Sequence, residues 1–175
     1  MSAQHTKTPL DRIEIVIDTR EQTPWHFDEA FADVTTGTLR IGDYALRGDL
    51  NFAIERKSLD DFLGTISSGW DRFRRELERA RAAGFTLPII IEGRLEDCFY
   101  SIDEHGTPCP PQHDHPNVFP AFVLKRIGEL THMGASVFFA ENAHYAMAVA
   151  YSMLNERHAL KFKQDLKDKL CHKKQ

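Results

Sequence analysis

The chain has 175 residues, enough for one well-packed domain and too few for two of ordinary size. With 42% hydrophobic and 27% charged residues it has the composition of a globular protein, and its formal net charge of -4 gives no hint of nucleic-acid binding. No apolar run reaches the roughly 18 residues of a membrane span, and the polar N-terminus lacks the apolar segment of a secretory signal. Three widely spaced cysteines argue against a disulfide framework and for a reducing compartment, so we expect a cytoplasmic protein.

The charge is distributed unevenly along the chain. Residues 161–175 contain six lysines and two aspartates, so this segment is about +4 and the remainder about -8. We therefore expect three parts: a flexible N-terminus over residues 1–12, a folded domain over residues 13–160, and a basic C-terminal tail.

The first strand is expected at residues 13–17, an apolar run that ends at Asp18. Residues 19–38 are expected to be irregular, because Pro24 and Gly37 interrupt them.

An antiparallel hairpin is expected next. Residues 39–47 and 51–57 predict two strands, joined at the Gly48-Asp49 dipeptide.

Helices are expected where apolar residues recur at spacings of three and four. They cover residues 59–66, 70–83, 119–134 and 142–158. Ser58 and Asn142 are the candidate N-caps of the first and the last of these helices.

Two further buried strands are expected at residues 87–92 and 136–140, alternating with the helices. Residues 101–118, with four prolines, predict a loop insertion. Strands that alternate with helices predict an α/β sandwich, and the early hairpin makes its central sheet mixed.

The residues that can carry chemistry lie on the predicted hairpin. Glu55 and Lys57 share one face of their strand, since side chains alternate along it. A connection of three residues places Asp43 directly opposite Glu55, whereas a connection of two residues places it opposite Ile54, on the other face.

A pair of opposed carboxylates destabilises a sheet unless a cation joins them. Hard oxygen ligands suit Mg²⁺ or Mn²⁺, so Asp43 and Glu55 are candidate metal ligands, with Asp18 as a further ligand or supporting acid. A metal ion beside Lys57 suits phosphodiester hydrolysis, because the lysine can orient water or stabilise developing negative charge.

In combination these motifs resemble the XPF-type structure-specific endonuclease domain, a branch of the restriction-endonuclease-like superfamily. The resemblance rests on Asp18-Thr19-Arg20-Glu21, Gly42-Asp43-Tyr44, Glu55-Arg56-Lys57 and Asp61. It extends in order and type from about residue 13 to residue 92, and only a helix–strand–helix pattern matches beyond. It implies a restriction-endonuclease-like three-layer sandwich with a central mixed β-sheet flanked by helices.

The resemblance also implies a Mg²⁺-dependent DNA endonuclease that acts on branched or duplex DNA in repair, recombination or replication. Asp43 and Glu55 are then the metal ligands and Lys57 is the catalytic lysine. Supporting roles fall to Asp18, Arg20, Glu21, Arg56 and Asp61. Family members usually act as dimers, so a homodimer or a partner nuclease subunit is expected, in the cytoplasm, at the nucleoid or encoded by a phage. The paired helix-hairpin-helix motifs common in the family have no match here.

Several supporting residues have a structural interpretation beside the functional one. Arg56 faces away from Glu55 and is either a buried ion-pair partner or a phosphate contact. Glu21 either helps to bind metal or holds Arg20, and Asp61 either caps its helix or orients the lysine or Arg20.

The candidate DNA contacts are Arg72 and Arg75 on the helix over 70–83, together with Arg20. The alternative for the helix is an ordinary solvated face. For the whole domain, the rival hypotheses are a catalytically silent nuclease-fold scaffold that binds DNA and a hydrolase of RNA or a small molecule. The intact acidic residues and Lys57 argue against the scaffold.

Overall fold

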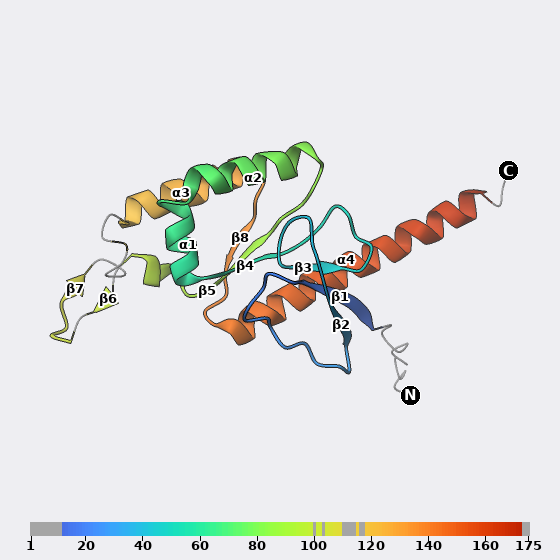
Figure 1. The fold of residues 1–175 in the computed structure, drawn as a ribbon, viewed down its shortest axis with the longest axis horizontal. Helices are drawn as coiled ribbons and strands as arrows, with labels where there is room; N and C mark the ends of the chain where they lie inside the picture. Colours follow the sequence, from blue (N-terminus) through green and yellow to red (C-terminus); the bar gives the residue numbers. More distant parts are fainter. Residues whose placement is uncertain (1–11, 100, 103, 110–114, 116–117, 173–175) are drawn as a thin grey trace, which may run out of the picture.

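The computed structural model describes residues 12–99, 101–102, 104–109, 115 and 118–172. The predicted flexible N-terminus over residues 1–12 therefore lies, except for Arg12, outside the described residues. No helix in the part described is long and apolar enough to cross a membrane. Helices lie on both faces of a central sheet, with three of them on one face and a long one on the other (Figure 1).

β1 (Ile13–Asp18) is the first predicted strand, and it lies between two partners. β2 (Ala32–Gly37) runs parallel to it and β3 (Tyr44–Leu46) runs antiparallel. Because β2 falls in a stretch expected to be irregular, that prediction is wrong. Only Ala32 of this edge strand is buried, so no apolar alternation reveals it, and its one signal is the β-branched run at residues 34–36.

Three more strands pair in parallel, in the order β4 (Glu55–Ser58), β5 (Ile89–Glu92) and β8 (Val137–Phe139). The two groups of strands meet where Tyr44 pairs with Ile54, one residue before β4. The strand order is therefore β2-β1-β3-β4-β5-β8, with parallel and antiparallel neighbours, which confirms the predicted mixed sheet.

The predicted hairpin is present but shorter than expected. In place of two long paired strands over residues 39–47 and 51–57, the chain makes one bridged pair. Outside that bridged pair, β3 pairs with β1 and β4 pairs with β5. Each arm thereby gains a second neighbour, which satisfies backbone hydrogen-bonding groups that a two-stranded hairpin leaves open.

Helices on the two faces of the sheet bury two separate hydrophobic cores. The four helices are α1 (Leu59–Ile66), α2 (Trp70–Ala82), α3 (Pro120–His132) and α4 (Ala143–His172). Ile89 and Ile91 of β5 pack with α1, α2 and α3, while Ile90 packs with α4. The three-layer α/β fold is thus confirmed.

The predicted caps are found at both ends of this set of helices. Ser58 Oγ accepts a hydrogen bond from the N–H of Asp61 at 3.1 Å and caps α1. Asn142 Oδ1 accepts from the N–H groups of His144 and Tyr145 at 3.0 and 3.1 Å and caps α4.

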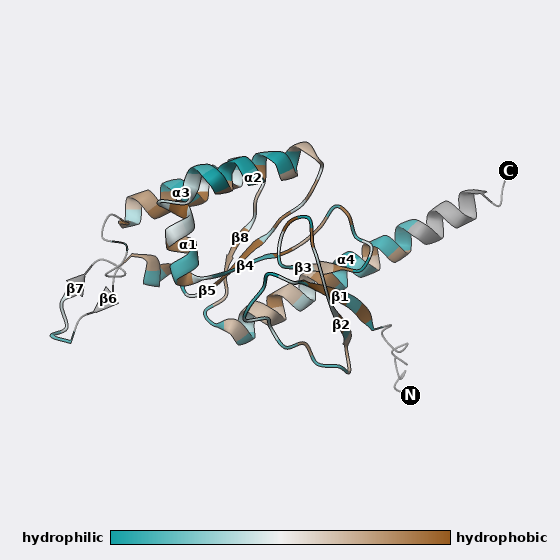
Figure 2. Ribbon diagram, in the orientation of Figure 1, coloured by the Kyte–Doolittle hydropathy of each residue, from teal (hydrophilic) through white to brown (hydrophobic). Residues whose placement is uncertain are grey.

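α4 is longer than expected, because it continues to His172 instead of ending near residue 158. The predicted boundary between a domain ending at residue 160 and a separate tail over 161–175 therefore falls inside a helix. Leu154 is the last fully buried residue among those of α4 up to residue 164, and the helix extends beyond the sheet (Figures 1 and 2). Lysine, leucine and glutamine are good helix formers, so the polar segment continues the helix that the core begins.

The predicted loop insertion over residues 101–118 contains a short antiparallel pair of strands. These are β6 (Ser101–Ile102) and β7 (Pro108–Cys109), and a short 3-10 helix (Leu95–Cys98) precedes them. The segment after β7 lies largely outside the described residues.

Candidate active site

Asp43 and Glu55 are brought together at the bridge between β3 and β4. The carbonyl oxygen of Ile54 accepts hydrogen bonds from the N–H groups of both Asp43, at 2.8 Å, and Tyr44, at 3.1 Å. Two residues of one strand thus oppose one residue of the other, a β-bulge of the kind that re-aims side chains beside active sites. The pairing of Tyr44 with Ile54 is the register of the predicted three-residue connection, the one that places Asp43 opposite Glu55.

The two carboxylates are close enough to repel each other. Burial and then the negative charge of Glu55 raise the pKa of Asp43 to about 7. The N–H of Arg56, which donates to Asp43 Oδ2 at 2.7 Å, only partly opposes this rise.

The donor set fits a divalent cation, since a cation held by both carboxylates would remove their repulsion. Within the described residues, no group of three or more His, Cys, Asp or Glu side chains gathers into a metal site. Water or substrate oxygens would therefore complete the coordination, as they commonly do for Mg²⁺.

Lys57 lies on the same face of β4 as Glu55. Its Nζ donates to Glu55 Oε1 at 2.9 Å and lies 5.2 Å from the centre of the Phe73 ring of α2. The two charged side chains are only 13% and 16% exposed. An ammonium has three donors, so Lys57 is held in place while this contact uses one of them.

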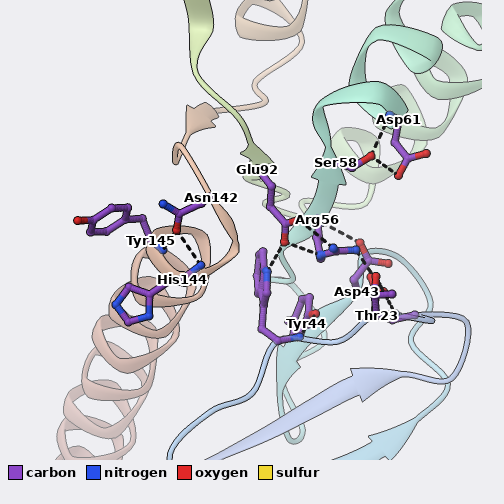
Figure 3. Close-up of polar contacts among 12 residues, drawn as sticks. Thr23, Asp43, Tyr44, Arg56, Ser58, Asp61, Glu92, Asn142, His144 and Tyr145 are labelled. Carbon is purple, nitrogen blue, oxygen red and sulfur yellow. Dashed lines mark hydrogen bonds and ion pairs between the residues drawn. The ribbon is translucent and has the colours of Figure 1, made fainter. Parts of the chain in front are cut away.

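Arg56 lies between Glu55 and Lys57 on β4, so its side chain points to the opposite face of the strand, beside Glu92 (Figure 3). Its guanidinium donates to the two carboxylate oxygens of Glu92 at 2.8 and 2.9 Å and to Glu21 at 3.3 Å. Its backbone N–H meanwhile holds Asp43. The structure thus favours the ion-pair interpretation of Arg56 over the phosphate contact.

Glu92 and Trp25 belong to this arrangement and were not anticipated. Glu92 Oε1 also accepts from the indole N–H of Trp25 at 2.5 Å. Trp25 stacks on Tyr44, with ring centres 4.5 Å apart, and donates from its backbone N–H to the Tyr44 hydroxyl at 2.9 Å. The sequence signal for Glu92 was its position at the end of an apolar strand, because a carboxylate buried there requires partners.

Asp18 and Arg20 form an ion pair at the end of β1. Asp18 Oδ1 accepts from the backbone N–H and Nε of Arg20, and Oδ2 accepts from Arg20 Nη2 and the Leu39 N–H. Burial alone would raise the pKa of Asp18, but these donors outweigh it and lower the pKa. Both oxygens hold Arg20 and the segment that leads to Asp43, so the structure favours this holding role over the predicted metal ligation.

The roles of Glu21 and Asp61 are also structural here. Glu21 accepts from the N–H of Thr23 at 2.8 Å and pairs with Arg56, whereas the prediction had it hold Arg20 or a metal. The carboxylate of Asp61 accepts from the Ser58 hydroxyl at 2.8 Å, so Asp61 takes the capping role (Figure 3).

The predicted DNA contacts lie at the surface. Arg72 and Arg75 are exposed on α2, and the Arg20 side chain is 67% exposed. Asp18 is the main cause of the raised pKa of Arg20, and the charge of Asp43 adds to it. The guanidinium of Arg20 therefore lies within electrostatic reach of the Asp43 carboxylate.

Comparisons with known proteins identify the family and the fold. The family model of the ERCC4 domain matches residues 17–152. XPF from Aeropyrum pernix aligns with a TM-score of 0.56 and 17% identity, covering 82% of this chain and 61% of that chain. XPF from Aeropyrum pernix in complex with DNA aligns with a TM-score of 0.56 and 20% identity, covering 86% and 66%. A search of the curated proteins finds no match.

The present chain spans less than two thirds of the length of each XPF chain, and at these identities the likeness shows the fold alone. The family model, in contrast, covers most of this chain, including the carboxylate pair and the lysine. The chain therefore belongs to the ERCC4 domain family and has the fold of the XPF nuclease domain.

Proposed function

We propose that the chain is a divalent-metal-dependent DNA endonuclease that hydrolyses phosphodiester bonds at Asp43, Glu55 and Lys57. The observation that carries the proposal is the bulge that sets two carboxylates together, with a largely buried ammonium beside them. Membership of the ERCC4 domain family supports nuclease chemistry. The DNA complex among the similar structures supports DNA as the substrate.

In this proposal Asp43 and Glu55 hold Mg²⁺, for which Mn²⁺ can substitute. When bound, the ion polarises a phosphate oxygen and makes a water molecule easier to deprotonate. Lys57 donates from Nζ to the attacking water or to the negative charge that develops on the phosphate. Its bond to Glu55 and its contact with the Phe73 ring fix Nζ before the substrate arrives.

Arg20 and Arg56 have different roles in this proposal. Asp18 anchors Arg20 at an exposed rim, where the guanidinium meets a phosphate of the substrate. Arg56 holds Asp43 through its backbone N–H and is itself fixed by Glu92, so it positions the site without contacting the substrate.

The test is cleavage of supercoiled plasmid and of labelled duplex, fork and flap DNA in Mg²⁺, Mn²⁺ and EDTA. We expect cutting by the wild type in either metal, loss of cutting in EDTA, and loss in Glu55→Gln and Lys57→Ala. Glu96→Gln is the matched control, because Glu96 is an exposed carboxylate whose partner is the surface residue Arg94. No cutting by a folded wild type on any substrate would favour the silent scaffold instead.

The biological setting is part of the same proposal. Branched or duplex DNA arising in repair, recombination or replication is the proposed substrate, and a second copy or a partner nuclease subunit is the proposed companion. The cytoplasm is the proposed location.

A further inference from the structure

Four arginines have no partner among the residues that the structure describes, and three of them lie on α2. All thirteen arginines of the chain lie within the described residues. Nine of them donate to a carboxylate or a carbonyl: Arg12, Arg20, Arg47, Arg56, Arg74, Arg81, Arg94, Arg126 and Arg157. The others make no hydrogen bond or ion pair with any described residue: Arg40, Arg72, Arg75 and Arg79. Unpaired guanidinium groups gathered near a carboxylate site indicate a surface for a multivalent anion.

Two of these arginines, Arg40 and Arg79, line the same pocket. Its volume is about 120 Å³, and Ile41 and Phe85 supply much of its apolar lining. Glu76 also lines it, and the charge of Glu76 acts on Arg20. We call this the Arg40–Arg79 pocket.

Arg40 is held in a fixed relation to the carboxylate pair. It follows Leu39, whose N–H donates to the buried Asp18 at 2.6 Å, and it precedes Asp43 by three residues. Gly42 packs so closely that an added Cβ would lie 2.8 Å from the Cβ of Ala53. The segment that carries Arg40 is therefore fixed at both ends.

Arg79 is held in a fixed relation to Lys57. Both it and Phe73 belong to α2, whose inner side is buried, and the Phe73 ring contacts the Lys57 ammonium. Six residues separate Phe73 from Arg79, which corresponds to about 9 Å along a helix.

We propose that the Arg40–Arg79 pocket binds a backbone phosphate of the DNA strand that the enzyme cuts. This inference rests on the proposed function, because it names where that enzyme holds its substrate. Because Arg40 precedes Asp43 by three residues and Arg79 shares α2 with Phe73, the bound phosphate lies within a few nucleotides of the scissile bond. Such a contact sets the position of the strand without reading its sequence.

The first test measures DNA binding in EDTA at a series of salt concentrations. For Arg40→Ala with Arg79→Ala, we expect the slope of log K against log salt to become shallower by about 1, the loss of one phosphate contact. Arg74→Ala is the matched control, because Arg74 lies on the same helix but pairs with Glu78, and its slope stays unchanged. Glu76→Gln removes the carboxylate of the pocket and tightens binding. The replaced arginines are exposed and unpaired, so thermal unfolding confirms an intact fold.

The second test replaces single phosphates near the scissile bond by uncharged methylphosphonates. For the wild type we expect cleavage in Mg²⁺ to fall about tenfold at one position within a few nucleotides of the cut. In the double variant the same replacement causes no further loss. The phosphate-binding assignment is overturned if the double variant has the same slope of log K against log salt as the wild type, or if the position effect persists in the double variant.

The two proposals fail in different ways. If the wild type cuts no unmodified DNA in Mg²⁺, the proposed function fails, and the binding slopes alone decide on the pocket. If the wild type cuts DNA and the double variant binds and cuts with an unchanged position profile, only the pocket assignment fails.

Discussion

At the scale of single residues, we expect the ionised Asp43 to oppose folding in the metal-free protein, because its carboxylate is buried and lies near that of Glu55. We predict that Asp43→Asn raises the unfolding free energy in EDTA at pH 8 by about 1 to 3 kcal/mol, because one pKa unit corresponds to about 1.4 kcal/mol. The asparagine oxygen still accepts from the Arg56 N–H. Since the pKa of Asp43 is raised from 3.8 to about 7, this gain grows as the pH rises through that interval.

Denaturant unfolding of both proteins, with and without Mg²⁺, checks this prediction. Mg²⁺ is expected to stabilise the wild type and to leave Asp43→Asn unchanged, and the variant is expected to cut no DNA. A variant that is less stable than the wild type in EDTA at pH 8 would show that the pair does not repel.

Glu92 acts on the site through Arg56. We predict that Glu92→Gln lowers stability by about 1 to 3 kcal/mol, because a charge-assisted bidentate pair becomes a weaker contact. Because Arg56 holds Asp43, the Mg²⁺ concentration for half-maximal cleavage should also rise, as is usual when a residue behind metal ligands is lost. A metal titration of the cleavage rate, with Glu96→Gln as the control, measures this. An unchanged Mg²⁺ concentration for half-maximal cleavage would show that Glu92 contributes to stability alone.

The sequence predicted the charged face of β4 because alternation alone sorts Glu55 from Arg56, and a three-residue connection places Asp43. It did not identify Glu92 or Trp25, because their contacts join segments 67 residues apart. Asp18 illustrates the same limit in part, since three of its four donors belong to the nearby Arg20 but the fourth, the Leu39 N–H, comes from 21 residues away.

At the scale of elements, the bulge depends on Gly42. Gly42 has φ +74°, and an added Cβ would lie 2.8 Å from Ala53 Cβ and 3.0 Å from the Ile54 carbonyl. We predict that Gly42→Ala destabilises the fold by more than about 2 kcal/mol, the strain of a left-handed residue plus a clash, and reduces cleavage. Gly48→Ala is the matched control, because Gly48 has φ +72° in the same hairpin but nothing within 4 Å.

Denaturant unfolding separates the backbone strain that both substitutions cause from the steric clash that only Gly42→Ala causes. Gly48→Ala should cost only about 1 kcal/mol, because it carries the backbone strain without the clash. Equal losses of unfolding free energy in the two alanine variants would show that close packing at Gly42 does not fix the bulge.

Elements with strong local signals were predicted well, and the others were not. α1 was placed correctly because Ser58 caps it, and α2 because its apolar residues recur on one side. β2 was missed because an edge strand with one buried residue has no apolar pattern. The end of α4 was misplaced because the helix continues to His172, well past the buried residues of its first half.

At the scale of the whole molecule, an ion pair fastens α4 to the loop between β3 and β4. Asp49 has a side chain only 2% exposed and accepts from Arg157 at 2.7 and 3.2 Å. Burial alone would raise the pKa of Asp49, but the bonds from Arg157 and the Asn51 N–H outweigh it, and the pKa is lowered below 3.8.

This pair predicts a pH dependence of stability. A carboxyl with a lowered folded-state pKa stabilises the fold above its unfolded pKa, and this contribution is lost as the pH falls through the folded pKa. We predict that Asp49→Asn lowers the unfolding free energy at pH 7 by about 1 to 3 kcal/mol. Unfolding free energies of both proteins should converge below the ordinary aspartate pKa of 3.8. A difference in unfolding free energy that stays the same at every pH would show that the charge of Asp49 does not stabilise the fold.

DNA cleavage by this domain, with a metal ion held by Asp43 and Glu55, is the central proposal. The most direct measurement is the single-turnover rate of nicking a supercoiled plasmid in Mg²⁺ by the wild type, Glu55→Gln and Glu96→Gln. We predict equal rates for the wild type and Glu96→Gln, and a loss of at least about a hundredfold in Glu55→Gln, as expected when a metal ligand is lost. A Glu55→Gln protein that nicks the plasmid at the wild-type rate would contradict it.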